Sequence, residues 1–411
     1  MYSIYYPFRG IVNLLQKNLF LQYYMETING SAFQIISIII FYTLLNIQLR
    51  MNTVTANNIK KHNFSAGPAI LPQTVIEQAA AAVLNFNNSN LSILEVSHRG
   101  KDFVAVMDEA TRLVKELLGL GEEFEVLFLT GGASSQFYMT AMNLLNENET
   151  ACYIDTGAWS TKAIKEAKMF GKVNVLASSK DKNFGYIPKG YAIPADTKYL
   201  HLTSNNTIYG TQLQKLPDTS TPIVSDMSSD IFSRPIDPSR YDLIYAGAQK
   251  NLGPAGTTLV IVRKDILGKV SRAIPTMLDY STHVAKGSMF NTPPAYPIYV
   301  CMLTLRWLKE QGGLEQVQKM NEKKAALLYD EIDRNPHFKG TVAKEDRSLM
   351  NVTFMMEEDS LTEKFMAAAT EVGCVGLKGH RSVGGFRASI YNAMPYESVS
   401  ALVEVIHNFK G

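Results

Sequence analysis

The chain has 411 residues, a length that can bury a large hydrophobic core and that usually divides into two domains. Hydrophobic residues make up 46% of it and charged residues 19%, which is the ordinary balance of a soluble α/β enzyme, and the formal net charge is only +2. Residues 1–50 hold three of the 40 basic residues and one of the 38 acidic ones, so the remainder is neutral, which argues against a polyanionic partner such as nucleic acid.

The first fifty residues differ in composition from everything that follows. Residues 27–49 carry no charge, and their number fits one membrane-spanning helix of roughly 20 residues, although polar side chains such as Gln34 and Asn46 interrupt the segment. If this segment is an anchor, Arg50 and the lysines after it keep the following domain in the cytoplasm. Contact with a membrane is expected only in that case.

A second interpretation is that residues 1–50 are a non-homologous extension and that Met51 is the native start. The segment is rich in Ile, Asn, Tyr, Phe and Leu, as translated AT-rich upstream DNA would be. A cleaved signal peptide is the third reading, but the segment begins with little positive charge and its apolar stretch comes late. We favour Met51 as the start of a cytoplasmic enzyme.

After residue 60 the apolar periodicity alternates between the helical and the strand pattern. The expected helices and strands, in chain order, are helices over 73–84 and 104–118, a strand over 125–130, a helix over 136–145, a strand over 151–155, a helix over 161–170, and strands over 173–177, 199–203, 222–227, 243–246 and 258–262. Such alternation predicts an α/β fold with a mostly parallel sheet covered by helices.

The pattern changes after a helix expected over 298–310. A long amphipathic helix over 314–334 follows Gly312-Gly313, and shorter units come after it, a strand over 351–356 and a helix over 361–372. We therefore predict three parts. These are the extension 1–50, a large domain 62–310 and a smaller α+β domain 311–411.

The three cysteines are odd in number and lie far apart. Cys152, Cys301 and Cys374 form no Cys-x-x-Cys pair, which excludes a disulfide framework and argues against a zinc site. We read them as buried thiols in a reducing compartment and predict no metal centre.

Lys250 has the surroundings that a pyridoxal phosphate (PLP) lysine requires. It follows the strand 243–246 in a run of small residues that lets a flat cofactor approach, and Asp226 ends an earlier apolar strand. A lone lysine is usually a solvated charge, and a lone aspartate could cap a turn. Together they supply an amine for a Schiff base and a carboxylate for a pyridinium nitrogen.

Other candidate residues could bind anions or cover the cofactor ring. Gly132-Ala133-Ser134 opens a helix directly after a strand, where backbone N–H groups bind phosphate. Trp159 could stack on a cofactor or be a core aromatic. The pairs His98-Arg99 and His380-Arg381, the second followed by Arg387, are unusual in a chain with seven histidines and fit a pocket for a dianion.

Several motifs in this order resemble the phosphoserine aminotransferase family from about Lys61 to the C-terminus. They are Ser97-His98-Arg99, Gly131-Gly132-Ala133, Thr156-Gly157-Ala158-Trp159, Asn206-Thr207-Ile208-Tyr209-Gly210, Ser225-Asp226-Met227-Ser228-Ser229, Ser233-Arg234-Pro235, Ala246-Gly247-Ala248-Gln249-Lys250, Phe290-Asn291-Thr292-Pro293-Pro294 and His380 to Ser389. The resemblance implies the fold-type I architecture of PLP enzymes, with a seven-stranded sheet, and a homodimer with two shared active sites.

The resemblance also implies a reaction and a role for each matched residue. The family converts 3-phosphohydroxypyruvate and glutamate to phosphoserine and 2-oxoglutarate in serine biosynthesis, and it also takes 4-phosphohydroxythreonine in pyridoxine biosynthesis. The implied cofactor contacts are Lys250 as the PLP lysine, Asp226 at the pyridine nitrogen, Trp159 on the ring, Thr207 at the phenolic oxygen, and Ala133, Ser134 and Gln249 at the phosphate, with Asn291 and Thr292 from the partner subunit. The implied substrate contacts are Arg387 at the α-carboxylate, and His98, Arg99, His380 and Arg381 at the phosphate or the distal carboxylate of glutamate.

One position departs from the family, and two other functions compete. Many members have an arginine where this chain has Ser134, so the two His-Arg pairs would bind more of the substrate phosphate. A cysteine desulfurase would need a nucleophilic cysteine on a mobile loop, whereas Cys374 lies in a segment that reads as buried. The alternative from another functional class is a membrane-tethered, non-catalytic PLP-binding protein. The set of catalytic residues is uninterrupted, which argues against a loss of activity.

Overall fold

The computed structural model describes residues 61–411. The predictions about the extension 1–50 and its apolar segment 27–49 lie outside the described residues. Within residues 61–411, no helix combines the length and the apolar character that crossing a membrane requires.

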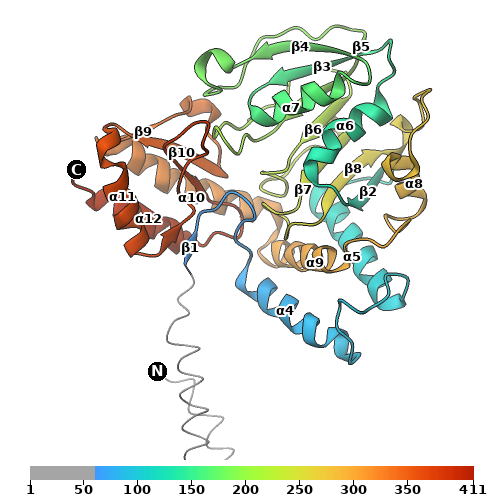
Figure 1. The fold of residues 1–411 in the computed structure, drawn as a ribbon, viewed down its shortest axis with the longest axis horizontal. Coiled ribbons are helices and arrows are strands. Elements are labelled where there is room, and N and C mark those ends of the chain that lie inside the picture. Colours follow the sequence, from blue (N-terminus) through green and yellow to red (C-terminus); the bar gives the residue numbers. More distant parts are fainter. Residues whose placement is uncertain (1–60) are drawn as a thin grey trace, which may run out of the picture. The chain divides into compact units, whose positions relative to one another are not determined.

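A seven-stranded sheet forms the centre of the larger part of the structure (Figure 1). Its strands, in spatial order, are β2 (Phe124–Leu129), β8 (Thr258–Arg263), β7 (Leu243–Gly247), β6 (Ile223–Asp226), β5 (Thr197–Thr203), β3 (Thr150–Asp155) and β4 (Lys172–Ser178). The five strands from β7 to β4 are parallel, whereas β8 is antiparallel to both β7 and β2. The predicted α/β fold with a mostly parallel sheet of seven strands is confirmed.

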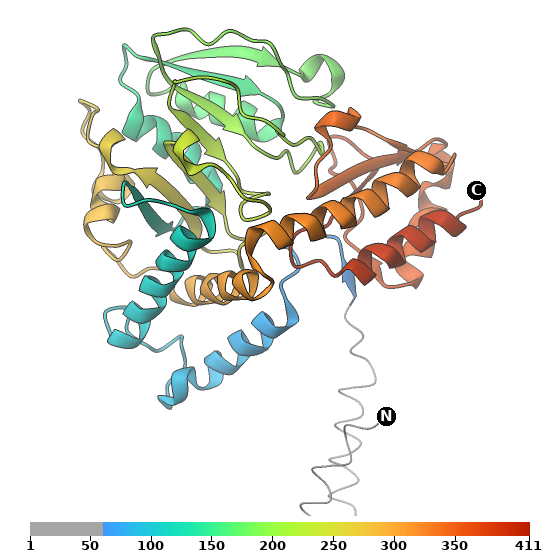
Figure 2. The same ribbon diagram turned by 180° about the vertical axis from the view of Figure 1, so that it is seen from behind.

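Helices cover both faces of this sheet (Figures 1 and 2). One face packs against α4 (Gln73–Leu84), α5 (Lys101–Leu118) and α9 (Ala295–Glu310), and the other against α6 (Gly132–Leu144), α7 (Ala158–Ala167) and α8 (Tyr280–Ala285). Strand β7 shows why both faces need cover. Its residues Ile244 and Ala246 pack in the core under α4, α5 and α9, whereas Leu243 and Tyr245 pack in the core under α6, α7 and α8. A strand that is apolar on both faces must be covered on both.

The helix expected over 161–170 begins and ends earlier, at Ala158 and Ala167. The hydroxyl of Ser160 accepts the backbone N–H groups of Thr156 and Gly157, both at 3.0 Å. These bonds satisfy donors that have no acceptor inside the helix, so the first turn forms before the apolar periodicity begins.

A second, smaller part contains most of the C-terminal residues. Its elements are β9 (Phe338–Gly340), β10 (Asn351–Met356) and β12 (Phe386–Ser389) in one antiparallel sheet, the parallel pair β1 (His62–Asn63) and β11 (Cys374–Val375), and the helices α10 (Gly313–Arg334), α11 (Thr362–Glu371) and α12 (Tyr396–Asn408). Phe64 and Ile70 belong to the same core. The start of the described chain therefore packs with the C-terminal part, and the division at residue 311 stays a prediction.

All three cysteines are free and buried. Cys374 is in β11, with 2% of its surface exposed, and burial raises the pKa of its thiol to about 11. A thiol of this kind is a poor nucleophile, because the reactive form is the thiolate.

Candidate active site

The predicted cofactor residues gather where β5, β6 and β7 end. Asp226 is the last residue of β6 and lies in register with Thr203 of β5 and Tyr245 of β7. Lys250 comes three residues after the end of β7. Parallel strands bring their carboxyl ends to one edge of the sheet, and that edge is where ligands bind in open α/β folds.

The amine of Lys250 faces a hydroxyl and an aromatic ring. Its Nζ donates a hydrogen bond to Thr207 Oγ1 at 2.7 Å and lies 5.6 Å from the centroid of the Trp159 ring. Burial lowers the pKa of Lys250 to about 8, although the nearby carboxylate of Asp226 opposes this shift. Near neutral pH the lysine therefore holds more of the free, nucleophilic amine than a solvated lysine would.

Asp226 is buried and accepts two hydrogen bonds from one residue. The backbone N–H of Ser228 donates to Oδ1 at 2.9 Å, and the hydroxyl of Ser228 donates to the same oxygen at 2.6 Å. Burial raises the pKa of Asp226, while Ser228 and the charge of Lys250 oppose the rise. Asp226 thus caps a turn, and because both bonds go to Oδ1, its second oxygen can accept from another donor.

Thr207 connects the two basic groups of the site. Its hydroxyl accepts from Lys250, and its backbone carbonyl accepts from Nη1 of Arg387 at 3.3 Å. Arg387 is half-buried in β12, where burial lowers the pKa of its guanidinium. The family resemblance implies that Arg387 binds the substrate carboxylate and that Lys250 binds PLP. Both side chains are therefore bonded to the same residue, Thr207.

The glycine turn before α6 has the geometry of an anion site. Gly131 and Gly132 have φ angles of 97° and 69°, which a residue with a side chain rarely adopts. No side chain caps the N-terminus of α6, so the first N–H groups, among them those at Ala133 and Ser134, have no acceptor within the helix. Ser134 is exposed beyond this turn.

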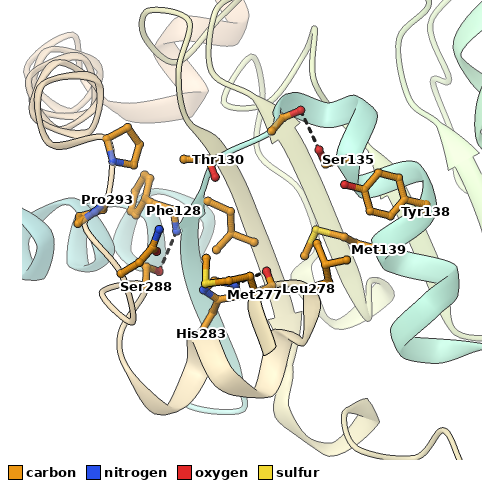
Figure 3. A pocket seen from close by; sticks show the side chains of 14 residues that line it. Phe128, Thr130, Ser135, Tyr138, Met139, Met277, Leu278, His283, Ser288 and Pro293 are labelled. Atoms are coloured by element: carbon orange, nitrogen blue, oxygen red, sulfur yellow. Dashed lines mark hydrogen bonds between the residues drawn. The ribbon is translucent and has the colours of Figure 1, made fainter. Parts of the chain in front are cut away.

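A cavity of about 190 Å³ opens beside the glycine turn, lined by side chains of β2, α6 and α8 (Figure 3). Gly131 and Asn291 both line it, from different segments. Within one chain Asn291 therefore lies near the glycine turn. Its assignment to the partner's phosphate site stays a prediction.

His380 accepts a hydrogen bond at Nδ1, which leaves Nε2 as the ring nitrogen that can donate. The backbone N–H of Ser382 donates to its Nδ1 at 3.2 Å, so the neutral ring carries its proton on Nε2. Burial lowers the pKa of His380, and the positive charges of Arg387, Arg381 and Lys162 lower it further. Several cations thus surround this histidine, as expected for a pocket that takes an anion.

Four predicted residues are not bonded to Lys250 within the described chain. His98 and Arg99 lie just before α5, and Asn291 and Thr292 lie in an exposed loop before α9. No hydrogen bond or ion pair within residues 61–411 joins any of them to Lys250. His98 is partly buried, and its Nε2 has no hydrogen-bond partner within those residues.

The sequence patterns did not predict a role for Ser228, although it lies in the same family motif as Asp226. The signal was available, because an aspartate followed two residues later by a serine is the pattern of an Asx turn. Tyr209 was also missed. Its hydroxyl interacts with Ser382, beside the His380-Arg381 pair, and nothing local in the sequence predicts that contact.

The residues present fit PLP. A partly buried amine, a buried carboxylate, an aromatic ring and an uncapped helix N-terminus meet the requirements of its aldehyde, pyridine nitrogen, ring and phosphate. Three of the buried polar atoms that have no hydrogen-bond partner within residues 61–411 lie on residues of this site or on the strand beside Asp226. They are Trp159 Nε1, Thr203 Oγ1 and Arg387 Nε.

The family model of the class-V aminotransferases matches residues 61–402. The chain belongs to the class-V aminotransferase family. It is therefore an aminotransferase, and the family implies PLP as its cofactor.

The relatives agree with the resemblance seen in the motifs. The phosphoserine aminotransferase of Flavobacterium johnsoniae is 62% identical over 349 residues, which cover 85% of this chain and 98% of that protein. The one from Bacteroides fragilis is 59% identical over 354 residues, covering 86% and 99%.

Solved structures of the same family have the same fold. Phosphoserine aminotransferase from Bacillus circulans subsp. alkalophilus has a TM-score of 0.83 and 49% identity, covering 85% of this chain and 98% of that one. PLP-bound phosphoserine aminotransferase from Trichomonas vaginalis has a TM-score of 0.81 and 39% identity, covering 85% and 100%. The predicted fold-type I architecture and family resemblance are confirmed.

Proposed function

We propose that this enzyme reversibly transfers the amino group of L-glutamate to 3-phosphohydroxypyruvate, giving O-phospho-L-serine and 2-oxoglutarate. The observation that carries the proposal is the junction at Thr207, where Lys250 and Arg387 meet, close to the cations around His380. High identity to phosphoserine aminotransferases supports it.

PLP, when bound, supplies an electron-accepting ring that stabilises negative charge at the substrate Cα. Lys250 would hold the cofactor through its amine and, once substrate has displaced it, this amine would carry a proton to and from the substrate Cα. Asp226 would hold a proton on the pyridine nitrogen, since its buried carboxylate has one oxygen not used by Ser228.

The remaining cofactor residues orient the ring and the phosphate. Trp159 would stack on the ring, and Thr207 would donate to its phenolic oxygen. The residues assigned to the cofactor phosphate are Ala133, Ser134 and Gln249. Gln249 is partly buried directly before Lys250 in the chain, and backbone N–H groups at the start of α6 are suitable donors for a dianion.

Two groups of cations would bind the substrate. Arg387 would grip the α-carboxylate with its guanidinium, for which planar bidentate pairing is favoured. His380, through Nε2–H, and Arg381 would bind the phosphate in one half-reaction and the distal carboxylate of glutamate in the other. Because 4-phosphohydroxythreonine carries the same phosphate, we propose it as a second substrate, with a role in pyridoxine biosynthesis.

The phosphate assignment predicts a preference between two substrates. With glutamate as donor, kcat/KM for phosphohydroxypyruvate should exceed that for hydroxypyruvate by about 100-fold, because a charge-assisted contact contributes about 1.5–3 kcal/mol and at least one is lost with the phosphate. A coupled assay for 2-oxoglutarate measures both rates.

The variant Arg381→Ala should reduce that preference, whereas Lys378→Ala, an exposed change three residues earlier, should leave it intact. Equal rates with the two substrates in the unmodified enzyme would refute the phosphate pocket.

We propose that the enzyme is a homodimer whose partner supplies His98, Arg99, Asn291 and Thr292 to each site. Arg99, Asn291 and Thr292 are exposed in the single chain, and no hydrogen bond or ion pair within residues 61–411 joins any of the four to Lys250, which leaves them available to the site of a partner. Three free, buried cysteines fit a reducing environment, and we propose that the dimer works in the cytoplasm.

Shared sites predict that two inactive variants restore each other. Lys250→Ala and Arg99→Ala subunits, unfolded and refolded together in equal amounts, should recover about a quarter of the activity of the unmodified enzyme. Half the dimers are then mixed, and each of these has one intact site of two. The assay compares the mixture with each variant refolded alone. If the mixture is no more active than the variants, Arg99 serves its own subunit.

A further inference from the structure

Lys324 of α10 is a buried lysine that the proposed reaction does not use. Only 1% of its surface is exposed, and no acidic residue in the described part of the chain pairs with it. Its Nζ instead donates to three backbone carbonyls, those of Ile390 at 3.1 Å, Tyr391 at 2.7 Å and Met394 at 3.2 Å. Burial lowers the pKa of Lys324 to about 7, whereas the three carbonyl acceptors match the three N–H donors of an ammonium and so favour the charged form.

The turn that Lys324 binds, residues 390–394, follows β12 without a break. Arg387 lies in β12, three residues before the first carbonyl that Lys324 contacts. The position of this turn therefore affects where the guanidinium of Arg387 lies.

The same turn is bonded to the loop of the catalytic lysine. The backbone N–H of Asn392 donates to Oδ1 of Asn251 at 3.0 Å, and Asn251 directly follows Lys250. The amide of Asn392 also donates to the carbonyl of Phe232 at 2.9 Å and accepts from Asn321, one turn before Lys324 on α10, at 2.8 Å. Asn251 itself is anchored on the carbonyl of Ile231 at 2.7 Å.

A second contact reaches Lys250 from the other side. The hydroxyl of Tyr391 donates to the carbonyl of Ala66 at 2.7 Å. The next residue, Gly67, packs so closely on Lys250 that a Cβ there would lie 3.4 Å from its Cγ. Two routes of hydrogen bonds and packing thus connect the turn to Lys250.

We propose that Lys324 is a positioning residue, which sets the distance between Arg387 and Lys250 by binding the turn 390–394. Burying an ammonium without a counter-ion is costly, and an apolar side chain would fill the same space at less cost. The benefit is directional, since the three N–H donors of Lys324 fix three carbonyls of one turn. The inference rests on the proposed role of Arg387 at the substrate carboxylate.

The test compares Lys324→Met with Lys323→Met, a matched change at the exposed neighbour on the same helix. Rates with glutamate are measured below the melting temperature of every variant. Lys324→Met should lower kcat/KM for glutamate by about tenfold or more, since misplacing a substrate-binding group by about 1 Å can cost about 100-fold. Lys323→Met should change it less than twofold. A Lys324→Met enzyme that melts earlier but keeps full kcat/KM would overturn the proposal.

A double-mutant cycle shows whether Lys324 acts through Arg387. In an Arg387→Ala enzyme, adding Lys324→Met should lower kcat/KM by less than about twofold, because the group that it positions is already absent. Full additivity of the two losses would contradict the proposal. If Arg387→Ala alone has no effect, the assigned role of Arg387 is wrong, which is a failure of the proposed function instead.

Should Lys324→Met not fold, Tyr391→Phe tests the same turn by removing one hydroxyl. It should also lower kcat/KM for glutamate, and the loss should again disappear in the Arg387→Ala background. A Tyr391→Phe enzyme with unchanged kcat/KM would then count against the proposal.

Discussion

Replacing Lys250 with alanine is expected to lower the rate of transamination by about 10⁴-fold or more, because the variant loses both the nucleophile and the proton carrier. The fold should remain, since Thr207 loses only one hydrogen bond, from a partly exposed group. The rate is measured with glutamate and phosphohydroxypyruvate. The absorbance of bound PLP near the visible edge, and its disappearance on adding glutamate, report binding.

Lys250→Arg separates the chemistry of the amine from its charge. This variant keeps a cation beside Asp226 but has no group that can bind PLP covalently, so it should be as inactive as the alanine variant. Lys286→Ala, a change at an exposed lysine, should keep full activity. A colourless Lys250→Ala protein that still transaminates would disprove the assignment.

Asp226→Asn should lower kcat by about 1,000-fold, because a neutral amide cannot hold a proton on the pyridine nitrogen. The amide has nearly the same shape, and its oxygen can still accept from Ser228. The loss should therefore be electronic rather than structural. Circular dichroism and the melting temperature test that the fold persists while kcat falls.

The chain contains a matched control for this change. Asp237 accepts a backbone N–H at 3.0 Å and a hydroxyl at 2.6 Å from Ser239, the same two bonds that Asp226 accepts from Ser228, but on an exposed turn. Asp237→Asn should leave kcat unchanged. If Asp226→Asn retains more than a tenth of the activity, the carboxylate only caps its turn.

Much of the fold could be predicted because the patterns are local. Short runs of apolar residues marked all seven strands of the large sheet, and glycine pairs marked the starts of α6 and α10. Element ends were less certain. At α7, a single hydroxyl on Ser160 moved the start of the helix from residue 161 to Ala158.

The site could be predicted in part. The neighbours of Lys250 and the strand that ends at Asp226 are sequential features, and the family resemblance added the residues that no pattern singles out. Ser228 could have been found from its spacing to Asp226, whereas the contact of Tyr209 with Ser382 could not, because these residues are far apart in the chain.

The sequence by itself determined the order of helices and strands, the family, Asp226 at the end of β6 and Lys250 shortly after β7, because each depends on neighbours within a few positions. Only the tertiary structure decided which distant groups meet. Thr207 bonds both Lys250 and Arg387, and Arg387 lies 180 positions further along the chain. Lys324 was an ordinary polar position on an amphipathic helix until packing buried it. A buried ammonium must then find acceptors, and it finds them on the turn beside Arg387.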